Sequence, residues 1–197
     1  MLTHNLHFYS HWARQRIGEM DAAIASLQRY AKRFPAGRES TRLTATLKKR
    51  RDRFESLAKK LTRMGAAAGE RSKTKLDSQW ETFEAEVSAF VKNAKRRSGF
   101  QKSAFSRIAA AQSKAWKDAE RSLCALARKI APARRSRVSA AIKRIRSDAS
   151  TARKRARKLG RSAVFGWSAM RSALKTSRKA FDKANHQAVR AIRKSLR

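Results

Sequence analysis

The chain has 197 residues, with 50 lysine and arginine residues against 14 aspartate and glutamate residues, so its formal net charge is +36. Such a chain repels itself unless counterions or a polyanion neutralise it, which restricts the expected partners to nucleic acid, an anionic membrane surface or another acidic polymer. Leucine, isoleucine, valine and phenylalanine supply only 34 residues, and 7 glycines and 2 prolines interrupt the chain. The composition therefore predicts an all-α protein of long, thin helices with little globular core.

Several classes of protein are disfavoured at this stage. The one cysteine, Cys124, excludes an internal disulfide framework, and its apolar neighbours predict a buried small side chain rather than a nucleophile. No stretch approaches the roughly 18 consecutive apolar residues that a membrane span needs. The N-terminus also lacks the basic and apolar regions of a secretory signal. These features predict a cytoplasmic protein.

In chain order, the first apolar pattern lies between residues 17 and 34, where apolar residues recur at alternating steps of three and four. They are Ile17, Met20, Ile24, Leu27, Ala31 and Phe34. This spacing places them on one face of a helix that needs a partner helix. The sequence Phe34-Pro35-Ala36-Gly37 then predicts the end of the helix, because the residue before proline avoids helical angles and glycine suits a tight turn.

A second pattern of the same period follows at Leu43, Leu47, Arg50, Phe54, Leu57, Leu61, Met64 and Ala68. A short connection between two such helices predicts an elongated antiparallel coiled-coil hairpin over residues 1–97. The period slips by one residue near Gly65 and Gly69 and resumes at Leu76. We favour one continuous helix through residues 40–97 that absorbs this slip, with a break before Trp80 as the alternative.

Three short sequences in this hairpin follow a known pattern. They are Leu47-Lys48-Lys49-Arg50-Arg51-Asp52-Arg53-Phe54-Glu55-Ser56-Leu57, Gly65-Ala66-Ala67-Ala68-Gly69-Glu70 and Trp80-Glu81-Thr82-Phe83. Through them, residues 10–95 resemble a group of largely uncharacterised bacterial antiparallel coiled-coil proteins, in which a short helix folds back on a long one. The resemblance implies a helical scaffold and no reaction.

Two further segments complete the chain. Residues 98–132 keep the same apolar period and are predicted to form a third amphipathic helix that ends at Pro132. Residues 133–197 are predicted to form long basic helices. Because alanine occupies the central apolar positions 149, 152 and 156, apolar burial is weak where charge is dense, and we expect this segment to be partly disordered or ordered by a partner.

Charge is concentrated in the last segment. Residues 1–97 have a net charge of +12 and residues 98–132 one of +5, whereas residues 133–197 combine 21 basic with two acidic residues, a net charge of +19. A solvated helix face normally mixes both signs, so this excess predicts a nucleic-acid-binding region whose cations contact phosphates. The candidate binding residues are Arg134, Arg135, Arg137, Lys143, Arg144, Arg146, Arg153, Lys154, Arg155, Arg157, Lys158, Arg161, Arg171, Lys175, Arg178 and Lys179. In composition this region resembles the tails of linker-histone-like and bacterial nucleoid proteins.

No motif for catalysis is present in the sequence. It has no glycine-rich phosphate loop, no cysteine pair at zinc spacing and no Ser-His-Asp arrangement with supporting context. We therefore expect no catalytic residue, no metal and no cofactor. Of the four tryptophans, Trp167 is the best candidate for stacking on bases because basic residues surround it, although packing is the favoured role for all but Trp12.

The leading hypothesis is a non-enzymatic protein that binds or compacts nucleic acid without sequence preference, as a nucleoid-associated protein or a structural component of a nucleoprotein particle. Its apolar stripes predict self-association or a helical protein partner. One alternative is a peripheral amphipathic-helix protein of an anionic membrane or granule surface, similar to phasins or apolipoproteins. The other is a coiled-coil adaptor for an acidic protein partner. Sequence reasoning does not separate DNA from RNA.

Overall fold

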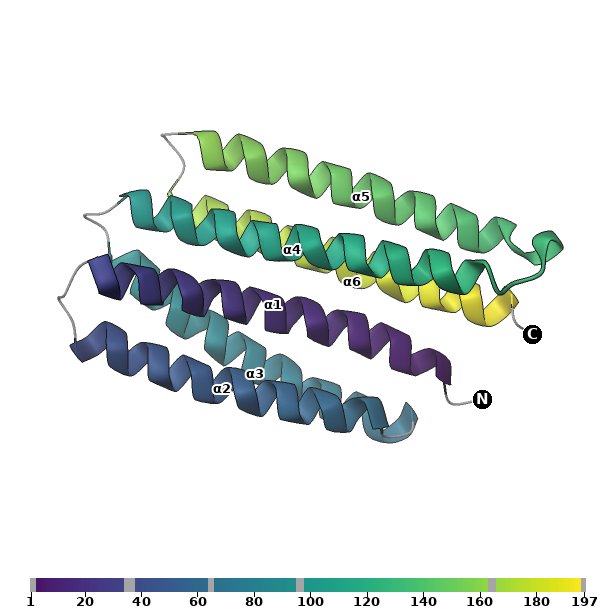
Figure 1. Ribbon diagram of the computed structural model, residues 1–197, viewed down its shortest axis with the longest axis horizontal. Coiled ribbons are helices and arrows are strands. Elements are labelled where there is room, and N and C mark those ends of the chain that lie inside the picture. Colours follow the sequence, from purple (N-terminus) through teal and green to yellow (C-terminus); the bar gives the residue numbers. More distant parts are fainter. Residues whose placement is uncertain (1–2, 34–37, 64–65, 95–97, 163–165, 196–197) are drawn as a thin grey trace. The chain divides into compact units, whose positions relative to one another are not determined.

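The computed structural model describes residues 3–33, 38–63, 66–94, 98–162 and 166–195. These residues form six α-helices and one 3₁₀ turn, and no strand occurs among them (Figure 1). The elements are α1 (Thr3–Arg33), α2 (Arg38–Arg63), α3 (Ala66–Asn93), α4 (Ser98–Ala127), η1 (Pro132–Arg134), α5 (Ser136–Arg161) and α6 (Trp167–Ser195). The predicted all-α class is confirmed.

The chain divides into two compact units. One comprises Ala13–Ala111, and the other comprises Met1–Trp12 together with Gln112–Arg197. We call them the 13–111 unit and the 112–197 unit. The division lies within α1 and α4, whereas the predicted segment boundaries at 97/98 and 132/133 coincide with the start of α4 and with η1.

Four helical segments form the 13–111 unit. The ring of Tyr30 on α1 lies 5.7 Å from the ring of Phe90 on α3 and 4.4 Å from that of Phe100 on α4. On α2, the predicted apolar residues Leu47, Phe54 and Leu61 are buried. The apolar face of each helix is therefore covered by its neighbours within the unit.

The preference for one continuous helix through residues 40–97 is wrong. Helix α2 ends at Arg63, α3 begins at Ala66, and the two helices pack against each other. The Arg50 guanidinium joins them by donating to both carboxylate oxygens of Glu86, at 2.9 and 2.7 Å. Folding back buries the stripes of both helices against one another, which a straight helix does not achieve. The alternative break before Trp80 lies inside α3, and the predicted end at residues 34–37 lies outside the described residues.

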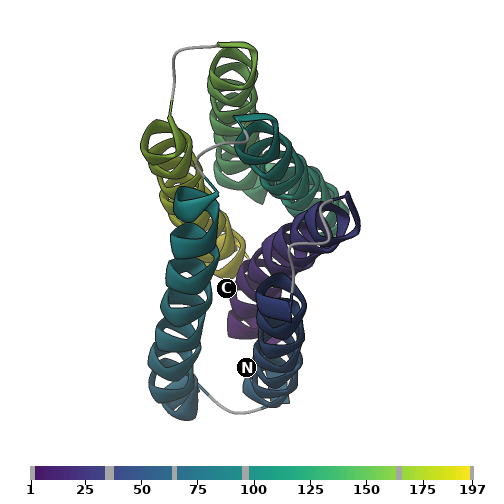
Figure 2. The ribbon, with the colours of Figure 1, turned by 90° about the vertical axis from the view of Figure 1, so that its left-hand side faces the viewer.

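The 112–197 unit contains an apolar core to which α4, α5 and α6 all contribute residues. The courses of α5 and α6 can be followed by their green and yellow colours in Figure 2. The Trp116 ring of α4 meets the Phe181 ring of α6 edge to face, with centroids 5.0 Å apart. The buried core residues are Trp116, Ala119, Leu123, Ile130, Val138, Ile142, Ile145, Ala149, Phe181, Ala184, Ala188 and Ile192. A buried hydrogen bond, from Gln112 Nε2 to the Leu174 carbonyl oxygen at 3.1 Å, further ties α4 to α6.

The contribution of α5 to this core is uneven along its length. Its first half buries Val138, Ile142, Ile145 and Ala149, and beyond these only Leu159 is buried. Small alanines on α5 and α6 let the two helices approach closely, but each buries little apolar area. The second half of α5 is therefore the more weakly packed half.

Replacing Phe181 by alanine tests the shared core. Because the ring is 1% exposed and packs on Trp116, we expect Phe181→Ala to lower the free energy of unfolding by about 3–5 kcal/mol. Chemical denaturation followed by circular dichroism measures this change. The exposed Lys179→Ala on the same helix is the control, with an expected change within about 0.5 kcal/mol.

The core also changes the expectation that residues 133–197 need a partner to become ordered. In protein freed of nucleic acid by nuclease and high salt, we expect slow amide exchange over residues 136–149 and 178–192, and faster exchange over 150–161. Hydrogen-exchange mass spectrometry measures these rates. Exchange at the rate of an unfolded chain throughout 136–195 would show that the segment depends on a partner after all.

Candidate nucleic-acid interface

The strongest concentration of charge lies at the C-terminal end of α5. Six basic side chains occur there within nine residues, and all six are exposed. They are Arg153, Lys154, Arg155, Arg157, Lys158 and Arg161, which we call the α5 cationic end. Between Asp148 and Asp182 the sequence contains no acidic residue. This end of the helix is therefore positively charged without local compensation.

Helix geometry places these cations around most of the circumference of α5. Successive residues are about 100° apart, so Ala152, Ala156 and Leu159 continue the side of the helix that includes the buried Ile145 and Ala149, and the basic residues occupy the rest. Arg153 and Arg155 lie toward opposite flanks, while Lys154 and Lys158 point outward between them. Charge is thus presented over a wide arc rather than along one line.

Repulsion within the α5 cationic end is not relieved by ion pairs among the described residues, although Arg153 Nε donates to the Ala149 carbonyl oxygen at 3.3 Å. The pairs Arg153 with Arg157, Lys154 with Lys158 and Arg157 with Arg161 stand four residues apart, and each like-charge pair costs about 0.2–0.5 kcal/mol in an exposed helix. None of the six residues forms an ion pair with another described residue. Anions from outside the chain are the available source of neutralisation.

The first half of α5 differs because two of its cations have acidic partners. Arg146 Nε donates to Glu120 Oε1 on α4 at 2.5 Å, and Arg144 Nε lies 3.9 Å from Asp148 Oδ2. The hydrogen bond that Arg146 donates to Glu120 raises the pKa of the Arg146 guanidinium above its usual range. Both arginines are exposed, yet part of their charge is already neutralised.

The other predicted binding residues divide into surface and structural positions. Arg134, Arg137, Lys143, Arg171, Lys175 and Lys179 are exposed. Arg135 is half-buried, and its guanidinium donates to the carbonyl oxygens of Ile130 and Arg128, at 2.5 and 3.2 Å. These carbonyls follow the C-terminal end of α4, so Arg135 holds the turn into α5 rather than facing solvent.

Arg178 does not belong to the exposed set, because it is only 6% exposed. Its position three residues before Phe181 places it on the buried side of α6, which also includes Asn185 four residues after Phe181. The buried stripe of α6 is wider than the apolar pattern predicts. Arg178 is therefore excluded from the candidate interface.

Two exposed cations were missed by the sequence analysis. Arg128 and Lys129 lie at the end of α4, and the Arg128 carbonyl accepts the hydrogen bond from Arg135. The predicted boundary at residue 132 separated them from Arg134 and Arg137. Basic residues occur on both sides of Pro132, and this continuity could have placed Arg128 and Lys129 in the same basic region as Arg134 and Arg137.

The four tryptophans are unavailable for stacking on bases. Trp12, Trp80, Trp116 and Trp167 are between 1% and 8% exposed. Packing is therefore confirmed as the role of Trp80, Trp116 and Trp167, and it extends to Trp12. Within the described part of the chain, no three histidine, cysteine, aspartate or glutamate side chains gather as they would around a metal ion.

Several cations of the 13–111 unit are engaged in ion pairs. Arg51 on α2 donates to Asp21 on α1 at 2.8 Å, and it also contacts Asp52 and Glu55. The hydrogen bond with Asp21 raises the pKa of Arg51, and the hydrogen bond from Lys59 together with the charge of Arg51 lowers that of Glu55. This unit uses part of its positive charge to join its own helices.

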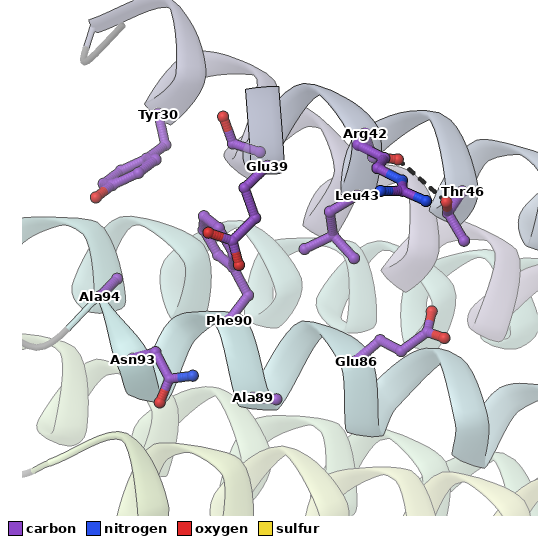
Figure 3. Close-up of a pocket in the computed structure, with 11 residues that line it drawn as sticks. Tyr30, Glu39, Arg42, Leu43, Thr46, Glu86, Ala89, Phe90, Asn93 and Ala94 are labelled. Carbon is purple, nitrogen blue, oxygen red and sulfur yellow. Dashed lines mark hydrogen bonds between the residues drawn. The ribbon is translucent and has the colours of Figure 1, made fainter. Parts of the chain in front are cut away.

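A depression of about 540 Å³ also lies in the 13–111 unit, between α1, α2 and α3 (Figure 3). Tyr30 and Phe90 supply aromatic walls, and Glu39 and Glu86 supply carboxylates. The Glu86 carboxylate is held by Arg50, and Arg42 borders the same space. Its charges are mixed, and the residues that line it include no histidine or cysteine.

Comparison with protein families, curated proteins and solved structures finds no match to this chain. The resemblances noted in the sequence therefore stay predictions. Among the described helices, none combines the length and the apolar content that crossing a bilayer requires.

The burial of Arg178 predicts that its substitution affects stability rather than binding. We expect Arg178→Gln to lower the free energy of unfolding by about 1–3 kcal/mol, since Arg178 is buried and its interaction within the chain is lost. Denaturant titration and nucleic-acid binding are measured together, with the exposed Arg157→Gln as control. Weaker binding by Arg178→Gln at unchanged stability would return this residue to the interface.

Proposed function

We propose that this chain is a non-enzymatic protein that binds nucleic acid through phosphate contacts, without sequence preference, as a structural or compacting component of a nucleoprotein assembly. The observation that carries the proposal is the α5 cationic end, where six exposed cations lie within nine residues and no acid occurs from there to Asp182. A phosphate backbone supplies regularly spaced anions, and release of its counterions favours binding of such a surface.

The distribution of charge around α5 supports nucleic acid over a flat anionic surface. A flat surface reaches the cations on one side of a helix, whereas the phosphate rows that flank a groove reach cations on both sides. The α5 cationic end presents Arg153 and Arg155 on opposite flanks, with Lys154 and Lys158 between them. A groove edged by phosphates can neutralise all of these positions.

Packing argues against the amphipathic membrane alternative for this unit. Insertion into lipid requires an exposed apolar face. On α5, Val138, Ile142 and Ile145 are buried in the core that α5 shares with α4 and α6. The apolar stripe is already occupied, and the exposed sides of α5 and α6 offer mainly charge.

Neutralising the α5 cationic end tests the proposal. The variant carries Lys154→Gln, Arg155→Gln, Arg157→Gln, Lys158→Gln and Arg161→Gln, which keep side-chain length and helix propensity. We expect the affinity for a random DNA duplex to fall roughly tenfold or more, and the slope of log K against log salt to decrease in magnitude by about four. Fluorescence anisotropy across a salt series measures both.

A matched control removes five exposed cations from α2 of the other unit. It carries Arg42→Gln, Lys48→Gln, Lys49→Gln, Arg53→Gln and Lys60→Gln. This variant has the same net charge as the first and is expected to retain most of the affinity. Equal losses in the two variants would mean that net charge alone governs binding, which contradicts a localised site. Anionic vesicles form a further arm, and vesicle binding that survives high salt without nucleic-acid binding would overturn the proposal.

A further inference from the structure

We infer that a single chain bridges two nucleic-acid duplexes, one held by the α5 cationic end and the other by a second basic surface on α6. The inference rests on the proposed function and goes beyond it, because it assigns two separate binding faces to one 112–197 unit. It is carried by where the exposed cations of α5 and α6 lie relative to the core that both helices share.

The second surface is a row of five exposed basic residues along α6. They are Lys175, Lys179, Lys183, Arg190 and Lys194, which we call the α6 cationic row. The first three follow at four-residue steps, about 6 Å apart along the helix. None of the five forms an ion pair with another described residue, and the sequence has no acid after Asp182. Asp182, between Lys179 and Lys183, is the one acidic residue within the span of the row, so the row is a second surface with a large excess of positive charge.

The two surfaces point in different directions because both helices bury their opposite sides in one core. On α6, Phe181, Ala184 and Ala188 face the core, and the residues of the α6 cationic row lie on the far side of the helix. On α5, Val138, Ile142 and Ile145 face the same core, and the α5 cationic end likewise turns away from it. With α4, α5 and α6 arranged around one core, the outer sides of α5 and α6 point away from that core in different directions.

Because a DNA duplex is stiff, this arrangement favours the binding of two separate duplexes over the wrapping of one duplex around both surfaces. A DNA duplex has a persistence length of about 150 base pairs, so a short segment bound along one helix does not bend around the unit to reach the other. The unfilled surface remains free to bind a second duplex. Once one duplex is bound, a neighbouring segment meets the second face at high effective concentration, which draws the two segments together.

The two faces differ in charge density, which sets the order of binding. The α5 cationic end has six cations in nine residues, whereas the α6 cationic row has five in the twenty residues from Lys175 to Lys194. Each phosphate contact adds to the affinity, so the first duplex binds at α5 and the second at α6. Affinity for one duplex and capture of a second are therefore separable measurements.

The experiment uses the full chain and a bead-immobilised DNA duplex, with a fluorescent duplex of unrelated sequence in solution. Capture of fluorescence on the beads reports bridging, and anisotropy with the fluorescent duplex alone reports single-duplex affinity. The α6 variant carries Lys175→Gln, Lys179→Gln, Lys183→Gln, Arg190→Gln and Lys194→Gln, and the five-residue α5 variant described above is its matched counterpart. Light scattering of the protein alone gives its oligomeric state.

We expect wild-type protein to capture the second duplex, and the α6 variant to lose about tenfold or more of this capture while its single-duplex affinity falls clearly less than that of the α5 variant. The α5 variant is expected to lose both affinity and capture. Capture by the α6 variant at the wild-type level would overturn the inference, and so would capture that arises only when light scattering shows a dimer. Equal loss of affinity and capture in the α6 variant would indicate one continuous surface and would also overturn it.

Failure of the inference and failure of the proposed function give different results. Wild-type protein that binds one duplex but captures no second would remove bridging and leave the proposed function intact. Wild-type protein that binds no duplex at all would remove the proposed function itself. Circular dichroism of each variant confirms that the helices are retained before either conclusion is drawn.

Discussion

Mutual repulsion among the cations of α5 and α6 is the interaction that the packing of the 112–197 unit must overcome. Against it stands a core in which Trp116 and Phe181 supply the large side chains and alanines fill much of the rest. In α5 this core extends to Ala149, and beyond that point only Leu159 is buried. The helix thus carries its densest charge where its own packing stabilises it least, and an external polyanion is the natural means of offsetting the repulsion there.

Local pattern was enough to predict the all-α class and the buried faces of the helices. The predicted apolar positions Val138, Ile142 and Ile145 are all in the core, because a helix of this period can bury only one side. The spacing of apolar residues does not identify which helix packs against each apolar face. The one-residue slip in the apolar period near Gly65 and Gly69 is compatible both with a straight helix that absorbs it and with two helices folded on each other. The outcome depends on apolar area that becomes buried only when α2 packs against α3.

The candidate site was predictable to a similar extent. A run of basic residues with only two acids predicted a candidate interface in residues 133–197, and most of those basic side chains are exposed. Two exceptions required three-dimensional information. Arg178 is buried because the buried side of α6 extends past the apolar residues around Phe181. Arg135 is drawn to the carbonyls at the end of α4, an interaction between residues that lie on either side of Pro132.

Lysine footprinting of the unmodified protein tests the central claim most directly. An acylating reagent is applied with and without a saturating random DNA duplex, and the modified positions are identified by mass spectrometry. The account predicts strong protection of Lys154 and Lys158 at the α5 cationic end, with little change at Lys48 and Lys49 on α2, all four of which are exposed in the free chain. Protection of the α2 lysines with Lys154 and Lys158 still fully reactive would contradict it.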